Sequence, residues 1–498
     1  MNVNPITRLD YPDLDVIRVE DTYYMVSTTM HFMPGCEILQ SFDLVHWEHV
    51  TYVYETLDHT DAQQLKSGQN IYGQGMWAAS LRYHEGRFCI CFVANDTRKT
   101  YLYTSEKIDG PWKKQLIEGF YHDGSLLFDE DGRNYIVYGN DEIWITELNE
   151  DLTAPKKGGL HRLLVSDHKN PELGYEGSHI QKINGYYYIF LVHSLRDRWM
   201  RTEACFYSDS LEGEFTGGDV LCDDRGYCGQ GVAQGGIVDT PDGKWYAMLF
   251  QDSGAVGRIP ILLPVTWKDH FPFFGQNGHV PEEIEVHSTR PGYIYQPLVG
   301  SDDFCNGLLP RWQFNHDPDP RYYHLDALQG TYTITTREVC TELTQAVNTL
   351  TQRMSYPSCA AEVTVDASAL KEGDVAGLCA LQSCYAAVGI TKHHGKYEVL
   401  MLDKKEDGIL DMTEGTVVES HQMDFRLEAD FCNMKDEARC YYRVNKGDWL
   451  PIGTVHKLYF KLDHFTGCRF GLFCYAAEET GGSACFRDFK YYDVDEIS

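Results

Sequence analysis

One pattern of hydrophobic and polar positions recurs along roughly the first 290 residues of the chain. A short strand leads into a turn, and a second strand that is rich in aromatic residues follows the turn. The turns are Glu20-Asp21, Glu85-Gly86, Asp131-Gly132, Asn184-Gly185 and Asp242-Gly243. The aromatic strands begin at Tyr23, Phe88, Tyr135, Tyr186 and Trp245. Because Gly, Asn and Asp favour the tight connection of a β-hairpin, the pattern predicts five hairpins of one design.

The spacing of the five units predicts how they are arranged. They follow one another at intervals of roughly 45 to 65 residues, which is typical of the blades of a β-propeller. The first strand of every blade begins near the central axis of a propeller, so equivalent positions converge there. The residues at this position are Asp13, Ala78, Asp123, Glu176 and Gln234. We therefore expect five blades, with three carboxylates meeting at one end of the axis.

The blade pattern stops between residues 293 and 303, and a different all-β pattern follows. Alternating strands at residues 362–365, 397–401 and 458–461 are typical of a β-sandwich. The fold predicted is therefore all-β, with a five-bladed propeller over residues 1–297 and a jelly-roll-like sandwich over residues 298–498. The second half shows no group of carboxylates, so we expect it to support the pocket or to form one of its walls.

Charge and cysteine content narrow the class of protein. Lys plus Arg number 43 and Asp plus Glu number 74, which gives a formal charge of −31 and argues against nucleic-acid or anionic membrane partners. The first residues lack the basic and apolar regions of a signal peptide, and no apolar run is long enough to span a bilayer. The 16 cysteines are scattered and form no CxxC pair, so we expect free thiols and a cytoplasmic location.

Three carboxylates around a cavity suit glycoside hydrolysis. One carboxylic acid protonates the leaving oxygen, and a second carboxylate activates water or attacks the sugar. At about 5 Å and an effective dielectric constant near 20, two carboxylates repel each other by about 3 kcal/mol, or about two pK units. We therefore expect Glu176 to stay protonated near neutral pH, as a general acid requires. Three carboxylates are also able to hold Ca²⁺, which is the competing interpretation.

Two aspartates at the start of the first strand need to be distinguished. Asp13 and Asp15 are two residues apart, so a regular strand would place both side chains on one face. From its position we expect Asp13 to be the chemical group and Asp15 to satisfy backbone amides. For either residue, an ordinary turn-forming aspartate is the alternative.

Four further residues are candidates for substrate binding: Trp77, Arg258, Phe32 and Gln234. The indole of Trp77 offers a flat face to a sugar ring, with simple packing between blades as the alternative. Arg258 stands among apolar residues, so we expect a carboxylate partner or substrate hydroxyls at its donors. Phe32 lies in an apolar loop that forms either a wall of the cavity or a cover for the next blade. Gln234 completes the axial set but does not titrate.

Several fragments together resemble the start and the body of glycoside hydrolase family 43. They are Asn4-Pro5, Tyr11-Pro12-Asp13, Tyr23-Tyr24, Ser41 to Trp47, Trp77 to His84, Asp123-Gly124-Ser125, Glu176 to His179 and Gly235 to Gly243. Residues from 301 onward resemble the β-sandwich of the family's β-xylosidase and α-L-arabinofuranosidase branch. The resemblance covers some 290 residues of the first half.

The resemblance implies a mechanism with inversion of configuration. It implies that Asp13 is the general base, that Glu176 is the general acid, and that Asp123 orients the acid and tunes its pKa. Trp77 and Arg258 would line the pocket of the −1 sugar. Gln234 replaces an axial histidine that many members associate with a metal ion, so we predict that no cofactor is required and keep a structural Ca²⁺ as the alternative.

These observations predict an exo-acting glycosidase that releases α-L-arabinofuranosyl or β-D-xylosyl units from arabinoxylan- or arabinan-derived oligosaccharides. The alternatives are an endo-arabinanase, which needs a groove open at both ends, and a sugar-binding propeller without catalysis. Convergent carboxylates argue against the second alternative, because burying them together is unfavourable. The sequence leaves open whether the chain forms a homo-oligomer.

Overall fold

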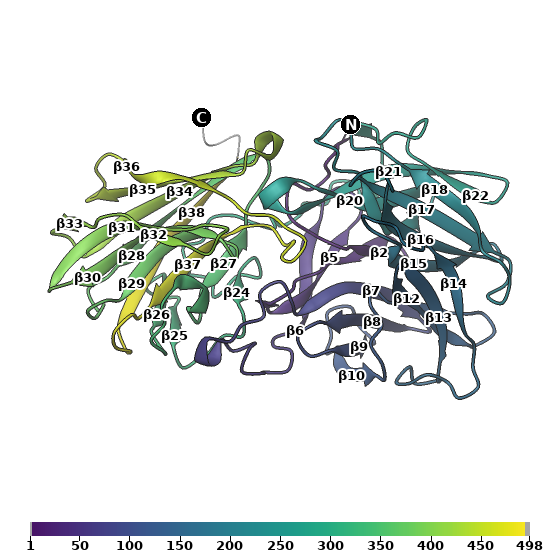
Figure 1. The fold of residues 1–498 in the computed structure, drawn as a ribbon, viewed down its shortest axis with the longest axis horizontal. Coiled ribbons are helices and arrows are strands. Elements are labelled where there is room, and N and C mark those ends of the chain that lie inside the picture. The colour runs from purple at the N-terminus through teal and green to yellow at the C-terminus, as the bar shows by residue number, and fades with distance from the viewer. Residues whose placement is uncertain (1, 494–498) are drawn as a thin grey trace.

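A computed structural model describes residues 2–493, and the chain forms two β-rich bodies that lie side by side (Figure 1). The body coloured purple to teal holds residues of the first half, and the green-to-yellow body holds the second half. Helical structure in this range is confined to four short 3-10 segments: η1 (Lys66–Gly68), η2 (Gly254–Val256), η3 (Leu343–Gln345) and η4 (Cys432–Met434). The all-β prediction is confirmed. No helix within residues 2–493 is long and apolar enough to cross a bilayer.

The first body is a propeller of five four-stranded antiparallel sheets, as predicted. Blade 1 consists of β2 (Asp15–Val19), β3 (Thr22–Val26), β5 (Gly35–Ser41) and β6 (Glu48–Tyr54). Blade 2 consists of β7 (Met76–His84), β8 (Arg87–Ala94), β9 (Lys99–Ser105) and β10 (Lys113–Ile117). Blade 3 consists of β11 (Ser125–Phe128), β12 (Asn134–Asn140), β13 (Glu142–Leu148) and β14 (His161–Ser166).

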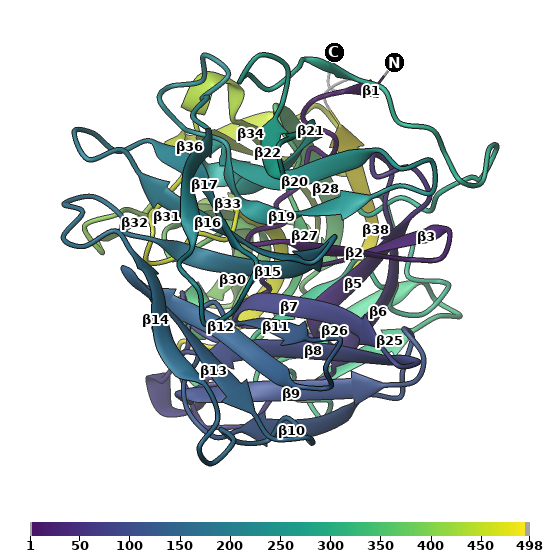
Figure 2. The ribbon, with the colours of Figure 1, turned by 90° about the vertical axis from the view of Figure 1, so that its right-hand side faces the viewer.

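Blade 4 consists of β15 (Glu176–Ile183), β16 (Tyr186–Ser194), β17 (Arg201–Ser208) and β18 (Thr216–Leu221). Blade 5 consists of β19 (Ala233–Asp239), β20 (Trp245–Asp252), β21 (Arg258–Lys268) and β22 (Phe271–Phe274). In Figure 2 the first strands of the blades, β2, β7, β11, β15 and β19, lie around the centre of the ring. An ion pair between Arg18 of β2 and Asp239 of β19 joins blade 1 to blade 5, and β1 (Asn2–Val3) pairs with β23 (Glu283–Ile284).

The first strands share a backbone feature at the axis, and it corrects the predicted alignment of blade 4. A residue with positive φ stands at the mouth of each one: Asp13 (51°), Ala78 (40°), Asp123 (48°), Gly177 (65°) and Gln234 (64°). Blade 4 thus places Gly177 at this position, and the prediction that Glu176 occupies it is wrong by one residue. Glycine adopts positive φ most easily, and a Cβ on Gly177 would lie 2.7 Å from Cγ of Gln234. Glu176 therefore corresponds to Trp77 of blade 2 and His122 of blade 3.

Hydrogen bonds between blades repeat with the same register. The amide N–H groups of Leu81, Leu126 and Ile180 donate to side chains of the preceding blade. The acceptors are Asp15, Ser80 and Ser125, in that order. In its own blade, each donor lies three residues after the residue with positive φ. In the preceding blade, each acceptor lies two residues after the residue with positive φ. These bonds hold the mouths of blades 1 to 4 at a fixed distance from the axis.

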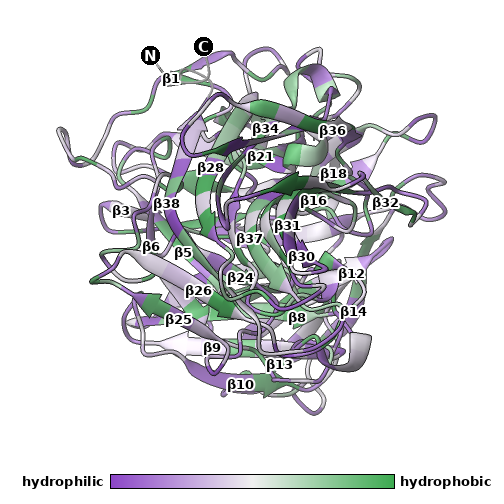
Figure 3. Cartoon of the chain, turned by 90° about the vertical axis from the view of Figure 1, so that its left-hand side faces the viewer, coloured by the Kyte–Doolittle hydropathy of each residue, from purple (hydrophilic) through white to green (hydrophobic). Residues whose placement is uncertain are grey.

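The second body, which faces the viewer in Figure 3, is a sandwich of two antiparallel sheets. One sheet holds β24 (Gln313–Asn315), β27 (Leu350–Arg353), β29 (Val375–Leu381), β30 (Tyr385–His393), β31 (Lys396–Lys404), β32 (Leu410–Met412), β33 (Thr416–Val418) and β37 (Arg469–Tyr475). The other holds β25 (Tyr323–Asp326), β26 (Thr331–Thr335), β28 (Ser358–Asp366), β34 (Gln422–Asp430), β35 (Glu437–Val444), β36 (Leu450–Lys457) and β38 (Ser483–Asp493).

The two bodies share structure that the sequence pattern did not predict. β4 (Phe32–Met33), which leaves blade 1, pairs with β24 and so adds a ninth strand to a sheet of the sandwich. Ala255 and Val256 of the propeller pack into the hydrophobic core of the sandwich. The predicted boundary at residues 297/298 falls in the segment between β23 and β24, which contains no strand. The propeller and the sandwich are therefore joined through a sheet as well as through a linker.

The cysteines behave as the sequence predicted. All 16 are free, and most are buried, including Cys89, Cys91, Cys379 and Cys474. Burial raises the pKa of the Cys91 thiol to about 12, so it acts as a small apolar residue of the core.

Candidate active site

Side chains from blades 3 and 4 meet at the axis around one imidazole. His122 Nε2 lies 3.6 Å from Asp123 Oδ2 and 3.6 Å from Glu176 Oε2. The amide N–H of Gly177 donates to Asp123 Oδ2 at 3.1 Å, so the carboxyl of blade 3 is tied to the backbone of blade 4. Asp123 is buried, whereas the side chain of Glu176 keeps 19% of its surface exposed. Glu176 is thus the more accessible of these two carboxyl groups.

Asp13 reaches the same pit from blade 1. Arg258 Nη1 donates to Asp13 Oδ1 at 2.5 Å, and the Thr28 hydroxyl donates to Asp13 Oδ2 at 2.6 Å. Arg258 Nε also donates to Asp252 at 3.1 Å, so this arginine has the carboxylate partners that we expected. The negative charges of Asp13 and Glu176 both act on Asp123. The three predicted carboxyl groups therefore meet, as the propeller geometry requires.

Asp15 has the structural role predicted for it. Its carboxylate accepts hydrogen bonds from the Leu81 amide at 2.8 Å and from Arg82 at 2.7 Å, and His179 Nδ1 lies 3.1 Å away. Burial raises the pKa of Asp15, but Arg82 and His179 outweigh burial and bring it down to about 2. Because blade 2 and blade 4 residues both bind this carboxylate, Asp15 holds blades together. His179 is a buried histidine with a partner.

Protons are distributed differently from our expectation. Burial, with the charges of Glu176 and Asp13, raises the pKa of Asp123 to about 6. The charge of Asp123 is the largest cause that raises the pKa of His122, to about 9. Burial raises the pKa of Glu176, but His122 beside it, together with the positive charges of Arg201 and Arg258, outweighs burial and lowers that pKa. The expectation that Glu176 is protonated near neutral pH is therefore wrong, because His122 beside it holds the pKa of that carboxyl below its ordinary value.

Aromatic rings from both bodies surround the carboxyl groups. Trp77 is half-buried, and its ring centroid lies 6.4 Å from that of His122 and 5.1 Å from that of Phe465. Phe465 belongs to the sandwich, and its ring lies 3.8 Å from Cζ of Arg258. Two residues after Phe465, the backbone amide of Gly467 donates to the carboxylate of Asp10 in the propeller. The second body thus places an aromatic ring beside these residues, and its role as a wall of the pocket stays a prediction.

The other two candidates for substrate binding lie deeper in the molecule. Phe32 is buried where β4 meets the sandwich, and its ring lies 3.4 Å from Cζ of Arg469. Gln234 is also buried, and its amide N–H donates to Glu203 at 2.7 Å. The side chain of Gln234 lies against Gly177. A substrate-binding role for Phe32 and Gln234 stays a prediction.

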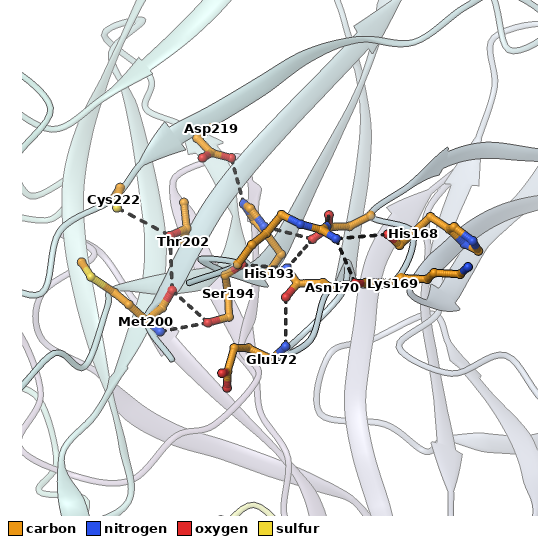
Figure 4. A network of polar contacts seen from close by, with 12 residues as sticks. His168, Lys169, Asn170, Glu172, His193, Ser194, Met200, Thr202, Asp219 and Cys222 are labelled. Carbon is orange, nitrogen blue, oxygen red and sulfur yellow. Dashed lines mark hydrogen bonds and ion pairs between the residues drawn. The ribbon is translucent and has the colours of Figure 1, made fainter. Parts of the chain in front are cut away.

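A polar network holds the segment that leads into Glu176 (Figure 4). Asn170 donates to the Ser194 carbonyl at 2.8 Å, and Arg196 donates to Asp167 at 2.7 Å. His193 lies 2.8 Å from Asp219 and 3.2 Å from Asp167. These contacts fasten residues 167–172 to the turn between β16 and β17. The Asp141 amide of blade 3 also donates to the Tyr175 carbonyl at 2.8 Å, so the entry to β15, and with it the position of Glu176, is held by blades 3 and 4 together.

Comparison with known proteins gives the family. Residues 3–272 match the profile of glycosyl hydrolases family 43, and residues 301–492 match the beta xylosidase C-terminal Concanavalin A-like domain. The chain belongs to glycosyl hydrolases family 43. The resemblance seen in the sequence is confirmed for both bodies.

Among relatives of this family-43 chain, a beta-xylosidase from Formosa agariphila is 26% identical over 99% of this chain and 89% of its own length. A non-reducing end alpha-L-arabinofuranosidase from Bacteroides ovatus is 23% identical over 82% of this chain and 79% of its own. A solved bifunctional GH43-CE protein from Bacteroides eggerthii is 41% identical, with a TM-score of 0.91. The match covers 100% of this chain but only 64% of that protein. An engineered GH43 enzyme described as both an endo-xylanase and an exo-arabinofuranosidase has a TM-score of 0.88 at 27% identity, with 99% of both chains covered.

Sequence reasoning missed four residues of the family-43 site. His122 carried a signal, because it precedes Asp123 as Trp77 precedes Ala78. Asn140, which donates to Glu176 at 2.7 Å, lies at the end of the aromatic strand of blade 3, beyond the residues that the repeat alignment compared. Arg201, whose charge lowers the pKa of Glu176, lies on β17, a strand that the alignment did not use. Phe465 carried no signal, because its place depends on how the sandwich packs against the propeller.

A metal ion does not suit these residues. Within residues 2–493, His122, Asp123 and Glu176 form the one group of three possible ligands whose atoms lie within 4.8 Å of one another. The charge of Asp123 raises the pKa of His122 to about 9, which favours the imidazolium, and an imidazolium has no lone pair on Nε2 for a metal. Both oxygens of Asp13 are already bound by Arg258 and Thr28, so a set of oxygen ligands for Ca²⁺ is not presented.

Proposed function

We propose that the chain is an exo-acting, inverting glycosidase that releases β-D-xylosyl or α-L-arabinofuranosyl units from arabinoxylan- or arabinan-derived oligosaccharides. Relatives named beta-xylosidase and non-reducing end alpha-L-arabinofuranosidase support this class of substrate. The observation that carries the proposal is the meeting of Asp13, Asp123 and Glu176 at one mouth of the propeller.

Each carboxyl group has a distinct role in this proposal. Asp13 takes a proton from the attacking water, and Arg258 and Thr28 fix the orientation of its carboxylate. Glu176 donates a proton to the glycosidic oxygen, which its greater exposure allows it to reach. Asp123 touches neither the water nor the leaving group, and it raises the proton affinity of the neighbouring groups by its charge.

The exo mode is supported by the wall that the sandwich adds. Phe465 stands against Trp77 and Arg258, so one side of the pit is closed by a residue from the other body. A closed pit accepts a chain end, whereas a groove open at both ends would accept the middle of a chain. A hydrolysis time course on a reducing-end-labelled oligosaccharide should release a monosaccharide first, and early internal fragments would contradict the exo mode.

The acid role is tested with Glu176→Gln. Activity should fall by about 10²- to 10⁴-fold on aryl pentosides with poor leaving groups, because these need a proton in the transition state. It should fall far less on aryl pentosides with good leaving groups. The exposed Glu212→Gln, on the same blade, is the matched control and should behave as wild type. Equal losses on both kinds of substrate would exclude Glu176 as the acid.

The base role and the stereochemistry are tested together. Asp13→Asn should lose activity on both kinds of aryl pentoside, because the attacking water needs a base whatever the leaving group. NMR of the first-formed product should show the anomer opposite to that of the substrate. A product of retained configuration would make Asp13 a nucleophile and would overturn this part of the proposal.

A further inference from the structure

When the imidazole of His122 is protonated, no acceptor within residues 2–493 forms a hydrogen bond with its Nε2–H group. Nε2 is buried and makes no hydrogen bond, although two carboxylate oxygens lie 3.6 Å away. At that separation neither contact is a hydrogen bond, and a shift of less than 1 Å toward either oxygen would make one. The imidazole ring of His122 lies edge-to-face with the ring of Trp77, and the two ring centroids are 6.4 Å apart. The His122 imidazole therefore lies between Glu176, the proposed acid, and Asp123, and it is hydrogen-bonded to neither.

The charges around His122 come from four blades. Asp123 on its own segment, Glu176 of blade 4 and Asp13 of blade 1 all act on the imidazole and favour its cationic form. On the far side of Glu176, Arg201 of blade 4 and Arg258 of blade 5 favour the ionised carboxylate. Asn140 also donates to Glu176 at 2.7 Å. This surrounding favours the pair of a His122 cation and a Glu176 anion.

We propose that His122 is a positioning residue that stores the proton which Glu176 delivers to the glycosidic oxygen. This inference rests on the proposed function and assigns the source of the acid's proton. When a sugar fills the pit it expels water, and an ion pair that loses its hydration becomes less stable than the neutral pair. The proton then moves from Nε2 of His122 to Oε2 of Glu176, a transfer that needs an approach of less than 1 Å from the separation in the empty site.

The transfer balances over one turnover. The N–H bond of the imidazolium breaks and leaves its electron pair on Nε2, while an O–H bond forms on Glu176. Glu176 passes this proton to the leaving oxygen as the glycosidic bond breaks, and Asp13 takes one proton from the attacking water. After the products leave, Asp13 releases its proton to solvent and His122 takes one from solvent. No group outside the chain, the substrate and water is needed.

The pH profile of His122→Gln tests the proposal. Glutamine keeps a polar side chain but stores no proton, so Glu176 must then hold its own. The alkaline limb of kcat/KM should move to lower pH by at least about one unit on substrates with poor leaving groups. If His122 only lowered the proton affinity of Glu176, the limb would move to higher pH. If it only supported the fold, the loss would be independent of pH and equal on good and poor leaving groups. Either of these results would overturn the proposal.

A second measurement is independent of activity. Difference NMR between wild type and His122→Gln should assign an imidazole that titrates well above the ordinary range of histidine, near 9. Titration near 6.5 would contradict the proposal even if the chain is a glycosidase. Absence of glycosidase activity with a high titration point would instead refute the proposed function and leave the charged cluster intact. His287→Gln, an exposed histidine whose nearest carboxylate is 3.8 Å away, is the matched control for both experiments.

Discussion

Two aspartates two residues apart show how partners decide the role of a side chain. Asp13 has φ of 51° and lies before β2, so it is outside the regular alternation that would have placed it beside Asp15. Its carboxylate opens on the pit, held by Arg258 and Thr28. Asp15 begins β2, and a backbone amide, Arg82 and His179 surround its carboxylate. The same residue type is therefore a chemical group in one place and a tie between blades in the other.

Asp15→Asn should destabilise the fold by about 2–4 kcal/mol at pH 7, because the partly buried guanidinium of Arg82 loses its counter-charge. The pKa of Asp15 is about 2 in the folded chain, below its ordinary value of 3.8. A depressed pKa stabilises the fold above the unfolded value, and this contribution is lost as the pH falls toward 2. Urea unfolding at pH 7 and at pH 3 should therefore show a smaller difference between wild type and variant at pH 3. An equal difference at both values would contradict this assignment.

At the scale of the element, the sequence predicts what is local and misses what is not. Turn dipeptides and aromatic strands lie next to each other in the chain, so the five hairpins were predicted correctly. The alignment of blade 4 failed by one residue, because a glycine after the glutamate adopts the positive φ that Asp13 and Asp123 adopt elsewhere. β4 has two residues and therefore no periodicity, and its partner β24 is some 280 residues away. Phe465 was missed for the same reason, because it lies far along the chain from Trp77 and Arg258, which it contacts.

Phe465→Ala tests the wall that the sandwich adds to the pit. The ring contacts Arg258 and Trp77, so its loss should weaken sugar binding by about 1–1.5 kcal/mol and raise KM about tenfold. The carboxyl groups keep their partners, so kcat should change less. Phe273→Ala removes a ring that is 49% exposed on β22, and it should leave both constants unchanged. A fall in kcat with unchanged KM would show that Phe465 acts on the reaction rather than on binding.

At the scale of the whole molecule, buried ion pairs tie the sandwich to the propeller. Arg353 of β27 lies 2.8 Å from Glu37 of β5, and both side chains are at most 5% exposed. Arg353 Nε also donates to the carbonyl of Asp10 at 2.9 Å. The Asp10 carboxylate in turn binds the amides of Arg258 and Gly467, next to Phe465. The position of Arg258 therefore depends on the contact between the two bodies.

We expect the whole chain to unfold in a single transition, because a shared sheet and these buried contacts couple the bodies. Arg353→Met should lower the free energy of unfolding by about 3–5 kcal/mol, since the buried Glu37 loses its guanidinium partner and keeps only His49 Nδ1, 3.1 Å away. The double variant Glu37→Gln, Arg353→Met should be more stable than Arg353→Met alone, because no buried charge is left unpaired. Calorimetry should give a calorimetric enthalpy equal to the van't Hoff enthalpy for wild type. The exposed Arg133→Met, whose partner Asp131 is also exposed, is the control and should melt as wild type does. Two separate transitions in the wild type would show that the propeller folds without the sandwich, and the closed pit would then be a contact between independent domains.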